Sequence, residues 1–217
     1  MYFHSRSEAG QKLAAELQQF RYENVAVVAL SDGSAIVAEQ IAISLHCAFT
    51  MLLSENVKMP GEHSPLGTVT QGGEFVYNSS LSEGERDEYY SEFHGYIDDQ
   101  RREKMSKMNH LLGQGGLMDP AMLREHVIIL VSDGFKHGTT LDAAAEFFKR
   151  VKINKLVVAT PIASVQAVDR MHIIADELHC LSVTENYIAT NHYYDINDTP
   201  PHDQIVQKIN EIVNNWQ

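Results

Sequence analysis

A buried-type run of five apolar residues, Val127–Val131, leads into a stretch that could hold an anion. It reads SDGFKHGTT over residues 132–140, and a helical pattern follows. Glycines let backbone amides approach a phosphate, and the positive end of the following helix favours negative charge. Threonine hydroxyls and one lysine add further donors. The predicted phosphate-binding residues are Gly134, Phe135, Lys136, His137, Gly138, Thr139 and Thr140.

Two aspartates stand where strands are expected to end. Asp133 opens the stretch just described and is the candidate catalytic residue, as a ribose or metal ligand; the alternative is an aspartate that caps the loop. The second, Asp32, lies in SDGS, where Asp32, Gly33 and Ser34 form a candidate pyrophosphate loop, or a simple turn. Mg²⁺ is the expected cofactor if either aspartate works through a metal, because carboxylates and phosphates are its usual ligands.

The overall charge restricts the partners. Seventeen basic against 29 acidic residues give a formal charge of −12. This argues against nucleic acid and membrane surfaces as partners, since both require basic faces. A small phosphorylated metabolite or nucleotide remains compatible, provided that local cations or Mg²⁺ offset the field of the protein.

Compartment is indicated by what the sequence does not contain. No apolar run approaches the ~20 residues that span a bilayer, and MYFHSRSEAG lacks the order of a signal peptide. Cys47 and Cys180 are read as two buried thiols of a reducing environment. A cytoplasmic location is therefore expected.

Alternating strands and helices must position these residues. Apolar segments predict strands near 25–30, 48–53, 127–131, 155–160 and 177–183, with helical patterns between most of them. Such alternation is typical of an α/β fold, a Rossmann-like, largely parallel sheet with helices on both faces. Ligands of parallel sheets lie beyond the carboxyl ends of the strands, where both aspartate loops fall.

The chain is expected to form a single domain over residues 1–217. SRSE at Ser5–Glu8 predicts a capped first helix, and the pattern over Asp203–Trp216 a final one. Residues 54–112 differ in character: prolines and glycines up to residue 80 predict a flexible loop or hairpin with a short strand near GEFVYN, and a long charged helix should follow and end at GQGG.

The segment ILVSDGFKHGTT resembles the signature of type I phosphoribosyltransferases that binds phosphoribosyl pyrophosphate (PRPP): aliphatic residues, two adjacent acids, a short loop and Thr-Gly-x-Thr. FHSRSEAGQKLAAEL, VVALSDGSAIVAEQIAISL and RREKMSKMNHLLGQGG resemble further segments of bacterial phosphoribosyltransferase-domain proteins, as do VVATPIAS, ADELHCLSV and HYYDINDTPPHDQIV. The resemblance covers most of the chain. It implies the type I phosphoribosyltransferase fold, with residues 54–112 in the place of the hood and flexible loop.

Three departures from that family pattern bear on function. Ser132 replaces the first of the two acids that hold the ribose hydroxyls. Asp32 stands where the pyrophosphate loop of relatives carries an arginine, and Ser54–Asn56 stand where they carry an Arg-Lys pair. Each change removes a partner of ribose or phosphate, and a charge-assisted hydrogen bond contributes on the order of 1.5–3 kcal/mol.

Two functions therefore stay open. The resemblance implies an enzyme that transfers phosphoribose from PRPP to a nucleobase-type acceptor. The departures favour a catalytically impaired module that binds a nucleotide 5′-phosphate or a related metabolite, in a regulatory role. The sequence names neither the acceptor nor the oligomeric state, although a homodimer is the commonest assembly for such folds.

Overall fold

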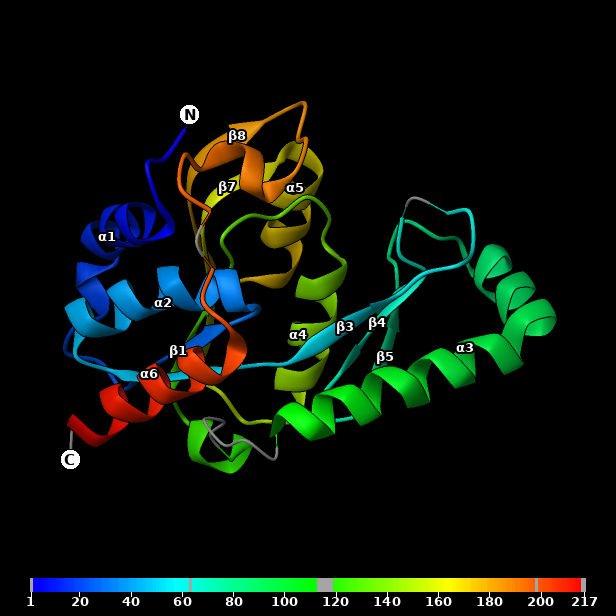
Figure 1. Cartoon of the computed structure of the whole chain (residues 1–217), viewed down its shortest axis with the longest axis horizontal. Coiled ribbons are helices and arrows are strands. Elements are labelled where there is room, and N and C mark those ends of the chain that lie inside the picture. Colours follow the sequence, from blue (N-terminus) through cyan, green and yellow to red (C-terminus); the bar gives the residue numbers. More distant parts are fainter. Residues whose placement is uncertain (1, 63, 113–118, 198, 216–217) are drawn as a thin grey trace.

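A parallel five-stranded sheet forms the centre of the molecule (Figure 1). The computed structural model describes residues 2–62, 64–112, 119–197 and 199–215. The strands lie in the order β2-β1-β6-β7-β8, and every neighbouring pair is parallel. Their bounds are β1 (Val25–Ala29), β2 (Ala48–Met51), β6 (Val127–Val131), β7 (Lys155–Ser164) and β8 (Glu177–Thr184). All five predicted strands are confirmed, and β6, which leads into the candidate phosphate loop, is central.

Helices cover both faces of this sheet, which confirms the predicted α/β class. Helices α1 (Arg6–Glu16), α2 (Asp32–Leu45) and α6 (His202–Asn215) pack on one face, and α4 (Thr139–Lys149) and α5 (Val165–Ile174) on the other. Successive side chains of a strand point to opposite faces. Accordingly, Val25, Val27 and Ala29 of β1 join the core beneath α1 and α2, whereas Ala26 and Val28 join the core beneath α4 and α5.

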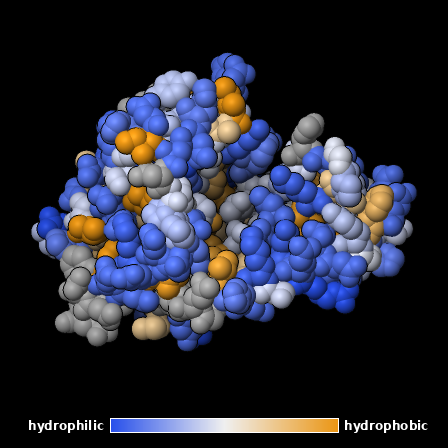
Figure 2. All heavy atoms as spheres, in the orientation of Figure 1, coloured by the Kyte–Doolittle hydropathy of each residue, from blue (hydrophilic) through white to orange (hydrophobic). Residues whose placement is uncertain are grey.

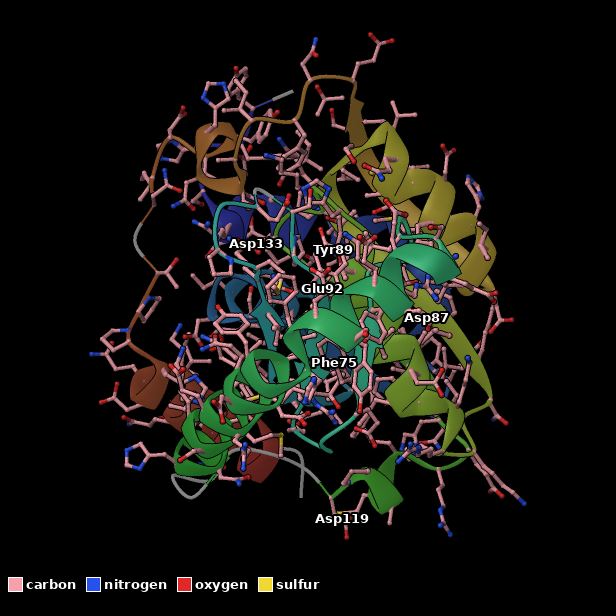
Figure 3. All side chains as sticks on the ribbon, turned by 90° about the vertical axis from the view of Figure 1, so that its right-hand side faces the viewer. Phe75, Asp87, Tyr89, Glu92, Asp119 and Asp133 are labelled. Atoms are coloured by element: carbon pink, nitrogen blue, oxygen red, sulfur yellow. The ribbon has the colours of Figure 1, made fainter. Side chains whose placement is uncertain are left out.

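Residues 54–112, called the hood from here on, form a separate layer. Strands β3 (Ser54–Val57), β4 (Gly67–Thr70) and β5 (Phe75–Tyr77) make an antiparallel sheet, and α3 (Glu83–Leu112) crosses it (Figures 1 and 3). Phe75 and Tyr89 lie against a small core of Met59, Leu66 and Ile97. Helix α3 loses helical geometry at Phe93. The sequence predicted one short strand here; three form because Val57 and Val69 are buried.

Serine side chains cap the first two helices. The Ser5 side chain accepts a hydrogen bond from the Glu8 amide, as the capping pattern predicted. Ser31 caps α2 in the same way by accepting from the Ser34 amide, so SDGS is the first turn of a helix rather than an open loop. Short 3-10 helices complete the described part of the fold: η1 (Gln18–Phe20), η2 (Pro120–Leu123) and η3 (Thr190–Tyr193).

Some predictions fall outside the described residues, namely the GQGG that should end the long helix and Trp216 of the last helix. The predicted last helix is confirmed as α6, and its Ile205, Ile209 and Ile212 are buried. The face shown in Figure 2 is largely hydrophilic with scattered hydrophobic residues. Within the described part of the chain, every helix is too short or too polar to cross a membrane.

Candidate functional site

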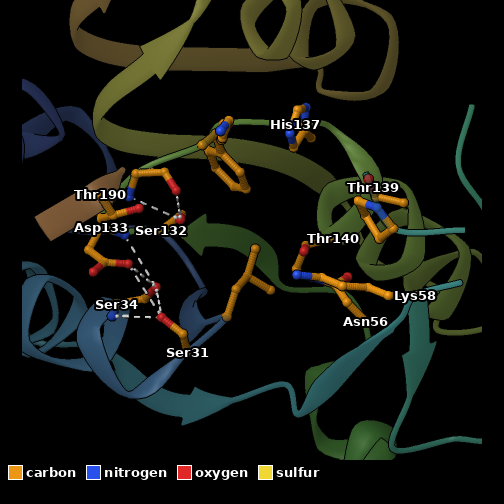
Figure 4. Close-up of a pocket in the computed structure, with 15 residues that line it drawn as sticks. Ser31, Ser34, Asn56, Lys58, Ser132, Asp133, His137, Thr139, Thr140 and Thr190 are labelled. Carbon is orange, nitrogen blue, oxygen red and sulfur yellow. Dashed lines mark hydrogen bonds between the residues drawn. The ribbon is translucent and has the colours of Figure 1, made fainter. Parts of the chain in front are cut away.

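A cavity of about 410 Å³ opens at the carboxyl ends of β1 and β6, between the sheet and the hood. Its size is within the range of small-molecule sites. Figure 4 shows Ser31, Ser34 and Asp133 on one side, and Asn56 and Lys58 of the hood on the other, close to Thr140. The lining residues are Leu30, Ser31, Ser34, Asn56, Lys58, Pro65, Ser132, Asp133, Gly134, Phe135, Lys136, His137, Thr139, Thr140 and Thr190.

The predicted phosphate loop forms the floor of the cavity. Six of its seven predicted residues line the cavity, and Gly138 caps α4 just behind them. Phe135 fixes the loop on the extended end of β7: its amide donates to the Ile162 carbonyl at 3.0 Å, and its carbonyl accepts from the Ser164 amide at 2.9 Å. The loop is thus held by the sheet itself, with the amino terminus of α4 open to the cavity.

Hydrogen-bond donors at this helix start are free. Over the described residues, no hydrogen bond uses the amides of residues 136–140 as donors. The Thr139 hydroxyl is buried and has no partner in the same part of the chain. Amides of a first helical turn have no intrahelical acceptor, and the helix dipole adds positive potential there. An anion seated on residues 136–140 would satisfy these groups.

The charge of the cavity is positive although that of the protein is negative. Lys136 and Lys58 contribute two cations. The pKa of His137 is lowered, first by burial and then by the neighbouring Lys136, while a hydrogen bond with Gln166 opposes the shift. The imidazole is therefore neutral at pH 7. Asp133 is the one acidic side chain among the lining residues, and it is neutralised by an arginine.

That arginine is Arg6, at the start of α1. Its Nε donates to Asp133 Oδ2 at 2.8 Å, and both side chains are almost fully buried. The other carboxylate oxygen, Oδ1, accepts from the Ser34 hydroxyl at 3.1 Å. Gly33 lies so close that a Cβ there would collide with Asp133 Oδ2 and Arg6 Nε. Both carboxylate oxygens of the candidate catalytic residue are therefore already engaged by the protein.

The rest of the Arg6 guanidinium joins the site to the C-terminal segment. It donates to Asn191 Oδ1 at 2.6 Å and to Asn197 Oδ1 at 3.2 Å, and it lies over the Tyr194 ring, 4.6 Å from its centroid. The Tyr194 hydroxyl donates to the Asp133 carbonyl at 2.6 Å. Burial raises the pKa of Tyr194, so this hydroxyl keeps its proton. Asp133 is held by groups from three separate segments of the chain.

The Asp32 side chain does not line the cavity, as a residue of a pyrophosphate loop would be expected to do. It is the first residue of α2, and its Oδ1 lies 2.7 Å from His202 Nδ1 at the start of α6. Ser31 and Ser34 are the residues of this turn that reach both Asp133 and the cavity, whereas Gly33 is buried. The structure does not bring Asp32 and Asp133 together around a shared space.

The aspartates do not fit a metal ion bound by the protein. Asp133 has both oxygens engaged, and Asp32 pairs with His202. In the described ranges, no three or more His, Cys, Asp or Glu residues gather in a way that could hold a metal. Mg²⁺ would have to arrive on the phosphates of a ligand.

Several residues of the site were not found from the sequence: Arg6, which supports Asp133, and Lys58 and Thr190, which line the cavity. Arg6 is 127 residues from Asp133, and no local pattern signals such a pair. Lys58 comes from the hood, four residues after the start of β3, and Thr190 from η3. Asn56 lies where an Arg-Lys pair was expected. The usable signal was Lys58 itself, a cation just before Pro60-Gly61 in the segment expected to cover the site.

Comparisons with known proteins identify the family of the chain. A family model of the phosphoribosyl transferase domain matches residues 4–196. The Mycobacterium tuberculosis protein Rv0571c (strain H37Rv), provisionally named a phosphoribosyl transferase, is 26% identical over 197 residues, which are 88% of this chain. The same match covers 43% of that protein, so the chain spans less than half the length of this relative.

Solved structures repeat the fold. The protein TT1426 from Thermus thermophilus superposes with a TM-score of 0.74 and 25% identity, over 97% of this chain and 99% of that chain. The AQ2163 protein from Aquifex aeolicus, at 11% identity and a TM-score of 0.50 over 89% of this chain and 77% of its own, shares the fold. Because the family model spans both aspartate turns, the hood and the phosphate loop, the chain belongs to the phosphoribosyl transferase domain family.

Proposed function

We propose that the cavity binds a phosphoribosyl compound, with its 5′-phosphate on the amino-terminal turn of α4. The free amides of residues 136–140 and the unpartnered Thr139 hydroxyl supply donors, and Lys58 and Lys136 supply charge. This local excess of cations offsets the formal charge of −12 of the chain. Membership of the family supports a phosphorylated, nucleotide-type ligand.

One observation favours a 5′-monophosphate over PRPP. The single carboxylate of the cavity, Asp133, already accepts hydrogen bonds from Arg6 and Ser34. Ribose hydroxyls would have to share these two oxygens with Arg6 and Ser34, and the ion pair with Arg6 makes the carboxylate a weaker acceptor for a further donor. The donors of the phosphate loop are not shared in this way. The protein is therefore proposed to act as a binding module of the phosphoribosyltransferase fold.

A second candidate is transfer of phosphoribose from PRPP to a nucleobase-type acceptor, with pyrophosphate leaving. The observation that favours it is a second helix start at the same cavity. Ser31 and Ser34, in the first turn of α2, line the side opposite Lys58, and a helix amino terminus suits a second anion. In this reaction the chain would position both ends of PRPP and exclude water, which accounts for much of such catalysis.

Calorimetric titration distinguishes the two candidates. Ribose 5-phosphate and PRPP would each be titrated into the protein with and without Mg²⁺. The binding-module proposal expects ribose 5-phosphate to bind at least as tightly as PRPP under both conditions. Tighter binding of PRPP with Mg²⁺, together with pyrophosphate release when nucleobases are added, would overturn that proposal in favour of the transferase. Failure of both ligands to bind would reject the site itself.

Compartment and assembly remain predictions. Cys47 and Cys180 are half-buried, not buried as predicted. Desolvation raises the pKa of the Cys47 thiol to about 12 and also raises that of Cys180, so both thiols are poorly reactive. A homodimer would be tested by light scattering on the purified chain.

A further inference from the structure

A second cavity, larger than the first, lies on the outer side of α4. Its volume is about 510 Å³. The hood closes it from one side with β5 and the start of α3, and α4 and α5 form the other walls. It shares no lining residue with the phosphate-loop cavity. A ligand in this space would therefore contact a different set of side chains.

The inner surface is mainly apolar. Its apolar lining residues are Val76 of the hood, Phe148 of α4, and Ile153, Leu156 and Ile174. Pockets of this size and composition bind small organic molecules by burying apolar surface. The hydrophobic gain is about 25 cal/mol per Å² removed from water, so the apolar body of a ligand would supply most of the affinity.

A single arginine at the rim lacks an acidic partner. Arg86 Nε is buried without a hydrogen-bond partner, and the guanidinium makes one long bond, 3.5 Å to the Asn78 carbonyl. None of the ion pairs among the described residues involves Arg86. Arg86 is half-buried, and a buried polar atom without a hydrogen-bond partner is unfavourable; the fork of donors of the guanidinium matches a carboxylate in geometry.

The other charges of the cavity form ion pairs, although Asp142 Oδ2 is buried without a hydrogen-bond partner among the described residues. Arg170 Nε lies 2.5 Å from Asp142 Oδ1, and Lys149 Nζ lies 2.6 Å from Glu146 Oε2. These two carboxylates would repel a dianion such as a phosphate monoester. A monoanion fits better, since it can meet Arg86 at one end and leave both existing pairs intact.

We propose that this cavity is a second ligand site, which takes a small monocarboxylic acid with an aromatic or branched apolar body. The carboxylate pairs with Arg86, and the body lies against Phe148 and Ile174. The site is independent of the phosphate loop, so its test does not depend on the function proposed above.

Ligand-observed NMR titration with 3-phenylpropanoate and its neutral amide, 3-phenylpropanamide, tests the proposal. The acid should bind at least tenfold more tightly than the amide. Arg86→Gln should remove that difference by weakening the acid at least tenfold. Arg102→Gln, on the same helix but exposed and paired with Asp99, should change neither ligand. Ala145→Phe, which fills the cavity from α4, should abolish binding of both.

Each contrary result overturns the site. Equal affinities for the acid and the amide would show that Arg86 does not bind the carboxylate. Unchanged affinity in Arg86→Gln or in Ala145→Phe would show that the ligand binds elsewhere. Absence of binding to the natural chain would reject the proposal directly. Thermal unfolding of each variant checks that it is folded, and the Arg86→Gln and Ala145→Phe changes provide two independent readouts.

Discussion

Arg6 and Asp133 are 127 residues apart in the sequence, and their side chains meet in a 2.8 Å hydrogen bond that is nearly closed to water. The carboxylate is thereby neutralised inside a cavity suited to anions. A free Asp133 would repel a phosphate; the paired one leaves Lys58 and Lys136 as the charges that a ligand meets. The expected arginine of the pyrophosphate turn is replaced by Asp32 in this sequence. Arg6 of α1 brings an arginine close to the cavity, but it binds Asp133 and not a ligand.

Arg6→Met should destabilise the protein by about 3–5 kcal/mol, because removal of one partner leaves the other charge buried and unpaired. Arg102→Met is the matched control: it breaks an exposed pair with Asp99 and should cost less than about 1 kcal/mol. Urea unfolding of both variants measures the two values. A loss below about 1 kcal/mol for Arg6→Met, the range of an exposed pair, would show that the pair is unimportant for stability.

Lys58→Gln should weaken ribose 5-phosphate binding about tenfold, the lower end for loss of one charge-assisted hydrogen bond, because Lys58 is exposed. Lys152→Gln, an exposed lysine outside the cavity, should have no comparable effect. Calorimetry at one fixed salt concentration provides both affinities. Equal losses in the two variants would point to general electrostatics instead of a contact from the hood.

Gly138→Val should reduce ribose 5-phosphate affinity at least tenfold. Backbone strain is not the reason, because Gly138 has an ordinary φ of −79°. A Cβ at Gly138 would instead lie 2.5 Å from Arg170 Cγ, so the helix start must shift away from α5. Gly84→Ala is the control, since a Cβ at Gly84 meets nothing within 4 Å. If calorimetry finds unaltered affinity in Gly138→Val, the anion does not sit on this turn.

Stability should depend on pH through His137. Its pKa in the folded chain is lowered below the ordinary value of 6.5. Near this pH the unfolded chain binds more protons than the folded chain. The contribution of neutral His137 to the free energy of unfolding is therefore complete above pH 6.5, and it is lost as the pH falls through the pKa that His137 has in the folded chain. His137→Asn should therefore lose less stability than the natural protein between about pH 7 and pH 5. If urea unfolding shows the same change of unfolding free energy with pH in the natural protein and in His137→Asn, the prediction is contradicted.

Binding of an anion next to His137 should favour the protonated form of its ring, whereas the unliganded protein favours the neutral form. An anion beside His137 favours the protonated ring, so sulfate affinity should rise as the pH falls below about 6.5. Sulfate is a suitable probe because it keeps its double charge over this range. Its titration at about pH 8, 6.5 and 5.5 should show a smaller pH dependence in His137→Asn than in the natural chain. The same dependence in both would assign the effect to other histidines.

The sequence predicted the sheet well because its strands carry local signals. Val127–Val131 is apolar throughout, as a strand covered on both faces must be. The hood was harder, because Gly67 and Gly73 read as breaks in regular structure although Gly67 lies within β4. The glycine is needed there, since the Phe75 ring occupies the space that a Cβ would take.

The site was predicted in part for the same reason. The phosphate loop is continuous in sequence, so its composition alone indicated an anion site. The direction of Asp32 depends on where α2 begins, and the environment of Asp133 depends on residues from α1 and from the C-terminal segment. Contacts between distant segments leave no pattern in any one stretch, which is why Arg6 and Lys58 were not found.

The three acceptors of Arg6 set an order of events during synthesis. Arg6 is made 127 residues before Asp133 and longer still before Asn191 and Asn197. A nascent chain that has reached β7 can already have paired β1 with β6, yet its guanidinium still lacks both asparagines and the Tyr194 ring. The support of Asp133 is therefore completed only after the segment from Asn191 to Asn197 has left the ribosome, and a chain that has not yet reached this segment should not capture the ligand.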